Sequence, residues 1–365
     1  MLRAGWLIFA VLVTACGAKT PSLTEGEKKV VMEVTMDMKS RCVGRYLIDL
    51  PVNVQPIGYA RFEEVIVRAQ AQTLDQFQSE MREREAALKA TKSTLGYQFF
   101  FDSGTVRGMK HTRYFVSLGD SGASSDIKRV IEAYKWDRGY QIKLNIDAAD
   151  SVHAEYAKRY KGTPYGIAEP MNNVPEKTEL AFDLIEKLQG RQDDMIPTEP
   201  GSCFAGGFLP GRAVSEEEEI HSYYVMPNLR DVSFSLETFG KLGADDKDTL
   251  LKRVSGGNAR EFLNEVNGRL IRSGSFELAG GAMADEAMMS GLTMASPPVQ
   301  GHLFSLETNY AGGALRPYLL LDMENGYPNH LVEPDQIKQA SLTEGEAIAV
   351  WDTVSRTLRP RPNAF

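Results

Sequence analysis

The sequence predicts an α+β fold of two similar domains, each an antiparallel sheet with covering helices. The chain has 365 residues, and dividing this length by about 150 residues per domain suggests two domains. The segment RCVGRYLIDLP at 41–51 is similar to SCFAGGFLPG at 202–211, and Cys42 and Cys203 are 161 positions apart. The strands and helices that follow come in a similar order, which predicts a duplicated domain. Two unrelated domains with a coincidental order are the alternative.

The first half opens with a strand and a long amphipathic helix. Val65, Val67 and Ala69 alternate with residues of the opposite face, which predicts a strand. Glu80 and Arg84 are spaced to form an ion pair on the outer face of the helix that follows. Its inner face is predicted from apolar residues at helical spacing, namely Leu74, Phe77, Met81 and Leu88.

Three further strands are predicted at 112–118, 129–136 and 140–147, since apolar and polar residues alternate there. Residues 137–139 form a three-residue hairpin loop in this interpretation, so the strands on either side are antiparallel.

The first half is predicted to close with a helix at 176–190, with Gly190 as its C-cap. This helix is expected to bury Leu180, Leu184, Ile185 and Leu188. The polar segment 191–201, which contains two prolines, is predicted to be a linker between the domains.

The second half repeats this order. Helices are predicted at 246–254 and 259–270, and strands at 302–309 and 316–324. A helix at 342–358 closes the half. Its signals are a capping box of Thr343 and Glu346 and an inner face of Ile348, Trp351 and Val354.

The N-terminus has the layout of a secretory signal. Arg3 precedes an apolar run that is shorter than the roughly 20 residues a membrane span needs. The segment VTAC at 13–16 resembles a bacterial lipobox, so Cys16 is predicted to be lipidated, and several acyl chains anchor a protein firmly. Gly17 after the cysteine favours sorting to the outer membrane. A plain cleaved signal with an incidental cysteine is the alternative.

These signals divide the chain into four parts. Residues 1–15 are the signal peptide, 16–39 a lipidated flexible tether, 40–195 the N-terminal domain and 200–365 the C-terminal domain. The expected location is the periplasm, with a lipid anchor in the outer membrane.

Charge and cysteine content restrict the partners. The net charge of −8 argues against nucleic acid and against electrostatic docking to anionic lipid, which both need a basic surface. An acidic surface suits a basic protein partner, or solubility alone. In an oxidising compartment Cys42 and Cys203 are an even pair that either forms a disulfide or stays as two separate buried thiols.

Catalytic and metal signals are weak. The string around Ser121 resembles the nucleophile segment of trypsin-like proteases, but His111 lies only ten residues before it and the segment reads as a loop. The five histidines show no pair at i,i+4 that would hold a metal. We expect no catalytic residue, no metal and no cofactor.

Two segments are candidates for contact with a protein partner. The acidic run Glu216, Glu217, Glu218 and Glu219 is a solvated loop or a contact for a basic partner. The methionine-rich segment 280–298 is predicted as an exposed contact loop or as a short helix packed on the sheet. It includes Met283, Met288, Met289 and Met294.

The openings CVGRYLIDLP at 42–51 and CFAGGFLPG at 203–211, on a lipoprotein-like chain of two α+β halves, resemble the two-domain immunity proteins directed against type VI secretion lipase effectors. The resemblance covers about residues 40–360. It implies a protein that is not an enzyme and that binds a phospholipase toxin in the periplasm, blocking its active site or the opening of its lid.

We expect the cleft between two linked domains, with the methionine segment and the acidic run, to contact the lipase, since a linked second contact raises avidity. Because interface residues vary with the effector, the resemblance assigns no contact residue. An envelope-assembly or copper-handling lipoprotein that uses the methionines is the alternative function. A hydrolase that uses Ser121 is a third.

Overall fold

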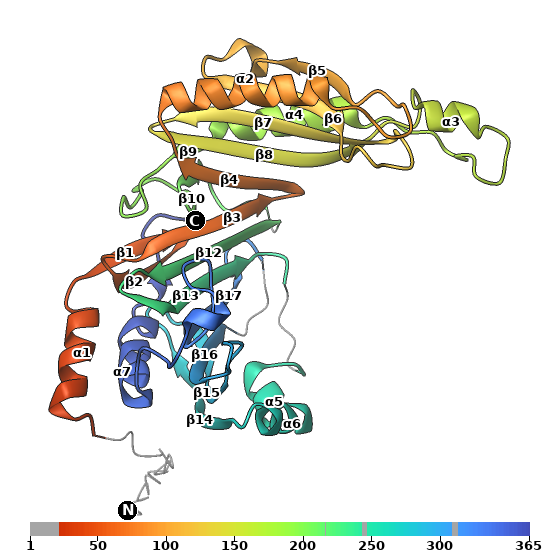
Figure 1. The fold of residues 1–365 in the computed structure, drawn as a ribbon. Coiled ribbons are helices and arrows are strands. Elements are labelled where there is room, and N and C mark those ends of the chain that lie inside the picture. Colours follow the sequence, from red (N-terminus) through yellow and green to blue (C-terminus); the bar gives the residue numbers. More distant parts are fainter. Residues whose placement is uncertain (1–21, 216, 243–246, 309–312) are drawn as a thin grey trace, which may run out of the picture.

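One continuous antiparallel sheet of twelve strands forms the centre of the molecule (Figure 1). The computed structural model describes residues 22–215, 217–242, 247–308 and 313–365. From one edge to the other, the strands are β14 (Arg269–Glu277), β15 (Met283–Leu292), β16 (Gln300–Thr308), β17 (Tyr318–Asn325), β13 (Leu229–Phe239), β12 (Glu218–Met226), β3 (Gln55–Phe62), β4 (Val65–Ala71), β8 (Tyr140–Ala149), β7 (Lys128–Asp137), β6 (Thr112–Leu118) and β5 (Phe100–Gly104). The α+β prediction is confirmed, but the two halves share a single sheet.

The N-terminal half of this sheet, β3 to β8, is covered on both faces. Phe115 and Tyr134 pack against α2 (Leu74–Ala90), whereas their neighbours Val116 and Ala133 belong to the core under α4 (Val174–Lys187). Successive residues of a strand point to opposite faces, so the two helices lie on opposite sides of the sheet.

Helix α7 (Glu344–Ser355) covers the C-terminal half, β12 to β17, and α1 (Glu25–Thr35) packs against α7. The short helices α5 (Leu250–Ser255) and α6 (Gly257–Glu265) lie beside β14 and β15. The predicted capping box at Thr343 and Glu346 is confirmed, and Ile348, Trp351 and Val354 are buried. The remaining short elements are α3 (Glu155–Arg159), η1 (Val106–Gly108) and η2 (Pro334–Gln336).

The two similar segments form two hairpins that face each other across the junction of the halves. One consists of β1 (Met38–Val43) and β2 (Tyr46–Pro51), and β2 also pairs with β18 (Arg359–Pro360). The other consists of β10 (Gly201–Phe204) and β11 (Gly207–Pro210), and β11 also pairs with β9 (Gln189–Gly190). A disulfide joins Cys42 to Cys203, with a Cα–Cα distance of 5.6 Å.

Several local predictions are wrong. Gly190 is a residue of β9, and Leu188 caps α4. Asp137 pairs with Tyr140, so the hairpin loop has two residues, Arg138 and Gly139, both with positive φ. These φ values suit the tight turn that matches strand twist.

The expected ion pair between Glu80 and Arg84 does not form, because tertiary partners compete for both side chains. Glu80 accepts hydrogen bonds from Gln72 and Gln141, and Arg84 donates to Glu132.

Two segments that were predicted as connections form part of the folded structure. Part of the predicted tether forms α1, which begins with a capping box of Thr24 and Glu27. In the predicted linker 191–201, Arg191 is buried and donates to six backbone carbonyls, including those of Cys42 and Phe204. The linker is therefore part of the packed junction.

Most of the methionine-rich segment 280–298 forms a strand, whereas an exposed loop or a short helix was predicted; Met294 lies in the loop that follows the strand. Residues 283–292 form β15, which pairs with β14 on one side and β16 on the other. Met288 is fully buried, whereas Met283 and Met294 are exposed. Among the described residues, no helix has the length and apolar character needed to cross a membrane.

Candidate functional site

Two cavities lie beside the junction of the two halves. β3 and β12 pair there over eight residues, from Glu218 opposite Phe62 to Val225 opposite Gln55. On the α4 side of this junction lies a cavity of about 590 Å³, of the size of a ligand pocket. We call it the junction cleft.

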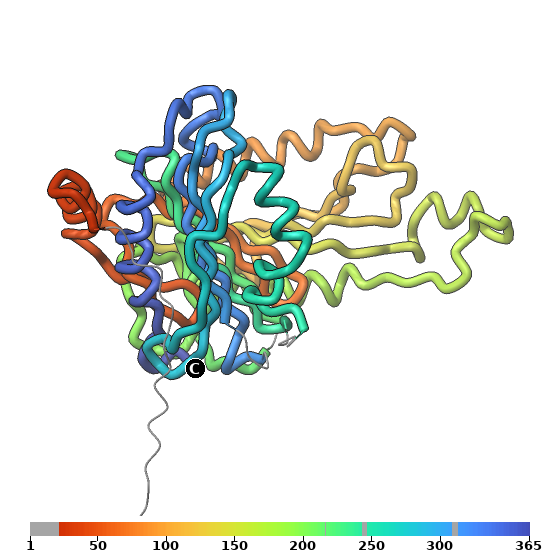
Figure 2. Tube along the Cα trace, turned by 90° about the horizontal axis from the view of Figure 1, so that it is seen from below, coloured from red at the N-terminus to blue at the C-terminus, as the bar shows by residue number. Residues whose placement is uncertain are grey.

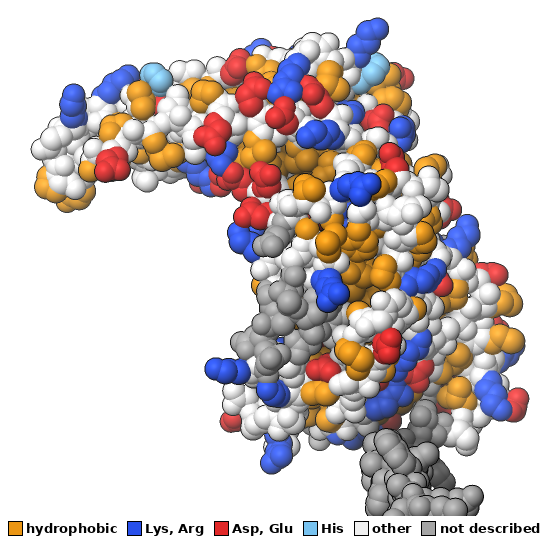
Figure 3. All heavy atoms as spheres, turned by 180° about the vertical axis from the view of Figure 1, so that it is seen from behind, with side chains coloured by type: hydrophobic (Ala, Val, Ile, Leu, Met, Phe, Trp, Pro, Cys, Tyr) orange, Lys and Arg blue, Asp and Glu red, His pale blue; other side chains and the backbone are white. Residues whose placement is uncertain are grey.

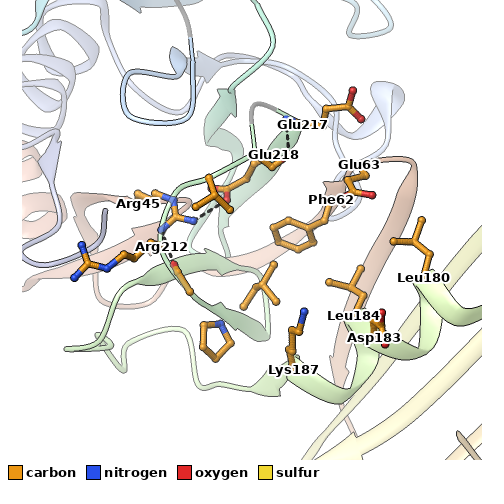
Figure 4. A pocket seen from close by; sticks show the side chains of 15 residues that line it. Arg45, Phe62, Glu63, Leu180, Asp183, Leu184, Lys187, Arg212, Glu217 and Glu218 are labelled. Carbon is orange, nitrogen blue, oxygen red and sulfur yellow. Dashed lines mark hydrogen bonds and ion pairs between the residues drawn. The ribbon is translucent and has the colours of Figure 1, made fainter. Parts of the chain in front are cut away.

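Both halves supply the walls of the junction cleft (Figure 4). Helix α4 contributes Leu180, Asp183, Leu184 and Lys187, and the end of β3 contributes Phe62 and Glu63. The opposite wall comes from β11 and the loop that follows it. Its members are Leu209, Pro210, Gly211, Arg212, Val214, Ser215 and Glu217, joined by Glu218 of β12 and Arg45 of the first hairpin.

The cleft combines an apolar wall with a charged rim. Phe62, Leu180, Leu184, Leu209 and Val214 form the apolar part, and Val214 is 88% exposed. A group of apolar side chains with a charged rim, as in this cleft, is typical of a protein interaction site. Seen from behind, acidic side chains gather beside apolar ones where the halves meet (Figure 3).

A buried arginine fixes one side of the rim. Arg45 is 5% exposed, and its Nη2 atom lies 3.0 Å from Oε2 of Glu218. Its Nη1 atom also donates to the carbonyls of Gly211 and Ala364. The loop that carries Val214 is therefore held to the first hairpin by charge-assisted hydrogen bonds.

Further contacts lock the halves together. The backbones of Gly44 and Cys203 exchange two hydrogen bonds of 2.8 Å next to the disulfide. Arg361 is 2% exposed and donates to the carbonyls of Pro197, Glu199 and Gly201. The cleft is consequently preformed and does not depend on the closure of two lobes.

A second cavity, of about 540 Å³, lies on the α2 side of the same junction. It is lined by strand edges and small residues, among them Gly58, Ala69 and Gly206. One large apolar side chain that lines it, Ile57, is 41% exposed, less than half the exposure of Val214, so the α4 side is the stronger candidate.

Only part of the predicted contact set reaches the junction cleft. Glu217 and Glu218 line it, Glu219 pairs with Arg61 at its side, and Glu216 lies outside the described residues. The methionines of β15 lie elsewhere, because β15 is separated from β12 by three strands in the sheet. At about 4.8 Å per strand, the distance is about 20 Å.

The methionines of β15 are also unsuited to share one copper ion. Met288 points to the opposite face of the strand from Met283 and Met289, since side chains alternate. Met288 is fully buried, and Met283 is exposed.

The described part of the chain does not bring together a metal-binding group, nor does it place His111 beside Ser121. No group of three or more His, Cys, Asp or Glu side chains there is placed to hold a metal ion. His111 precedes β6 and Ser121 follows it, so the length of that strand, about 23 Å at 3.3 Å per residue, separates them. Cys16 lies outside the described residues.

Family comparison agrees with this two-part architecture. The model of the N-terminal domain of Tle cognate immunity protein 4 matches residues 39–191, and that of its C-terminal domain matches residues 195–363. The chain belongs to the Tle cognate immunity protein 4 family. This is a family of immunity proteins against type VI secretion lipase effectors, as the resemblance of the cysteine hairpins implied.

Solved structures show the same fold. A chain in "The crystal structure of Tle4-Tli4 complex" is similar with a TM-score of 0.66 and 17% identity, over 90% of this chain and 99% of that one. The apo structure of immunity protein TplEi of the type VI secretion system from Pseudomonas aeruginosa gives 0.63 and 17%, over 90% and 98%. TplEi with an "L" peptide gives 0.59 and 17%, over 90% and 99%. No curated protein sequence matches the chain.

Sequence reasoning missed the apolar wall of the junction cleft. Leu180 and Leu184 were predicted as residues that α4 buries, yet they are only partly buried and line the cleft. No sequence motif marks Val214, which follows the second cysteine hairpin. Their grouping depends on the pairing of β3 with β12, and no local sequence pattern encodes that pairing.

Proposed function

We propose that this protein binds and neutralises a cognate type VI secreted phospholipase in the periplasm, and that the junction cleft is the centre of the contact. The observation that carries the proposal is the cleft itself, which both family domains build. Its exposed apolar wall and charged rim have the composition of a protein interface.

Rigidity supports the same function. The shared sheet, the Cys42–Cys203 disulfide and the buried arginines Arg45, Arg191 and Arg361 fix the cleft before a partner arrives. A preformed surface loses little conformational entropy on binding, which favours a tight complex. A toxin inhibitor needs such a complex, because residual free toxin remains active.

The chain acts without catalysis in this proposal. It holds the lipase and covers its active site or the lid that must open over it. Lipidation at Cys16 would keep the complex at the outer membrane, on the periplasmic side. Substitution Cys16→Ser tests this part, because it should move the protein from the membrane fraction to the soluble periplasmic fraction. Retention of the variant in the membrane fraction would contradict the anchor.

Affinity for the lipase encoded beside this protein tests the place of contact. Val214→Arg puts a charge on the apolar wall at a position that is 88% exposed, so the fold is kept. We expect an affinity loss of at least tenfold by calorimetric titration. Leu95→Arg is the matched control, since Leu95 is 53% exposed in the loop between α2 and β5. Equal affinity of both variants and the wild type would exclude the junction cleft.

A further inference from the structure

Between β8 and α4 the chain leaves the sheet and forms a projecting arm, residues 151–173, which contains α3 (Figures 1 and 2). Large apolar side chains on this arm are exposed, with Val152 at 48%, Tyr165 at 73% and Met171 at 50%. Such a group of exposed apolar residues on one projection indicates a surface for a partner.

The root of the arm is held firmly. Asp126 is 4% exposed, and its two carboxylate oxygens accept hydrogen bonds from the backbone N–H groups of Glu155 and Tyr156, at 2.8 and 2.9 Å. The backbone N–H of Ser151 donates to the carbonyl of Met171 at 2.8 Å, and the N–H of Met171 donates back to Oγ of Ser151. The arm is therefore presented in one orientation, which lowers the entropy cost of docking.

The outer part of the arm is aromatic and basic. The ring centroids of Tyr156 and Tyr160 are 4.6 Å apart, and those of Tyr160 and Tyr165 are 6.3 Å apart. Residues 156–168 contain Lys158, Arg159 and Lys161, and Glu155 and Glu169 flank them. Glu155 pairs with Lys158 at 2.7 Å. With three basic and two acidic side chains, the arm has a net charge of +1 in a chain of net charge −8.

Helix α4 connects the arm to the junction cleft. It begins at Val174, directly after the arm, and carries Leu180 and Leu184 into the cleft. At 1.5 Å per residue, Val174 and Leu184 are about 15 Å apart along the helix. A standard interface of about 800 Å² per partner is roughly 30 Å across, so a single partner centred on the cleft extends to the root of the arm.

We propose that the arm is a second docking element for the same lipase, and that it binds a surface carrying acidic and apolar side chains. This inference rests on the proposed function. Tyrosine and arginine are the side chains that most often dominate protein interfaces. The basic charge of the arm steers an acidic surface toward it and raises the association rate.

A membrane is the less favoured occupant. The described chain begins with α1, at the opposite end of the molecule from the arm (Figure 1). Residues 156–168 also lack Trp, Phe and Leu, which anchor interfacial segments in lipid.

The test uses the chain from Gly17 onward, which contains every described residue, and the lipase encoded beside this protein. Tyr165→Ser removes the most exposed ring of the arm, and we expect it to weaken affinity about tenfold, mainly through faster dissociation. The double variant Lys158→Glu/Lys161→Glu should lower the association rate at least fivefold at low salt, with a smaller difference at 0.5 M NaCl. Met195→Ser is the control, since Met195 is 56% exposed and lies outside the arm.

The outcomes separate the two proposals. Failure of the wild-type chain to bind the lipase contradicts the proposed function, and the role of the arm with it. Tight binding by the wild type with unchanged rates in both arm variants contradicts the arm alone. In a third outcome, the wild type binds phosphatidylglycerol vesicles, the arm variants lose this binding, and lipase affinity stays constant. This result would assign the arm to a membrane and overturn the inference.

Discussion

At the scale of single residues, buried arginines add to the apolar contacts that hold the junction together. Arg45, Arg191 and Arg361 are each 5% exposed or less and donate mainly to backbone carbonyls. Carbonyls at the ends of short hairpins have few partners in regular structure, and a buried polar group without a hydrogen bond is costly. Each arginine satisfies several of these carbonyls at once.

Arg45→Gln should lower the free energy of unfolding by about 3 kcal/mol, because it leaves Glu218 and two carbonyls without their buried partner. Urea unfolding measures the change. Arg61→Gln is the control, since the Arg61–Glu219 pair is 3.8 Å long and its side chains are 44% and 27% exposed. This substitution should change stability by about 0.5 kcal/mol or less. Equal effects of the two substitutions would show that Arg45 does not hold the junction.

Asp322 on β17 should make stability depend on pH. Burial raises the pKa of Asp322 to about 7, and the nearby carboxylates of Glu324, Glu237 and Glu307 add to this rise. The carboxyl is protonated in both folded and unfolded chains below about pH 4. As pH increases from about 4 to 7, the unfolded chain loses this proton first, so the free energy of unfolding falls and then levels off.

Asp322→Asn removes this dependence. The difference in unfolding free energy between the variant and the wild type should shift by roughly 3 kcal/mol in favour of the variant from pH 5 to pH 8. Urea unfolding at both pH values measures this shift. A stability difference that is the same at the two pH values would show that the carboxyl does not titrate in this range.

At the scale of elements, the sequence predicts most helices and strands, since periodicity and caps are local signals. Helices α2, α4 and α7 and strands β6, β7 and β8 lie within a few residues of the predicted ranges. The prediction for the methionine segment is wrong because its apolar residues fit neither strict alternation nor a helical face. β15 is buried between two neighbours, and a strand of this kind needs no alternation.

Met288→Ala should destabilise the protein by about 2 to 5 kcal/mol, because it opens a cavity in the core around β15. Met288 is fully buried there. Met283→Ala on the same strand should change stability by about 0.5 kcal/mol or less, since Met283 is 51% exposed. Thermal unfolding of both variants measures this, and similar melting temperatures would contradict the place of β15 in the sheet.

The disulfide connects the two cysteine hairpins and closes a loop with a sequence separation of 161 residues. The double variant Cys42→Ser/Cys203→Ser should therefore lose up to about 5 kcal/mol of unfolding free energy in the chain-entropy model. Guanidinium unfolding with and without reducing agent measures the loss, because reduction should affect the wild type and leave the variant unchanged. An identical midpoint for oxidised wild type and variant would contradict a stabilising bridge.

At the scale of the whole molecule, the duplicated order of elements produces a single rigid body. β3 pairs with β12 over eight residues, and β18 of the C-terminal half returns to β2 of the first hairpin. The sequence indicates two domains, and two family models match the two halves. The pairing of β3 with β12 between the halves could not be predicted, because these strands meet only in the folded chain. The acidic run is a local charge pattern, so it could be assigned to a cleft from the sequence. The apolar wall around Val214 could not, because its residues come together only through this long-range pairing.

The central claim is that this protein neutralises a phospholipase by occupying it with a preformed surface. The most direct test is a titration of the lipase encoded beside it with the chain from Gly17 onward, while phospholipase activity is followed. Our account predicts that activity falls to zero at a fixed molar ratio, with tight binding measured in parallel. Full lipase activity at saturating concentrations of the protein would contradict it.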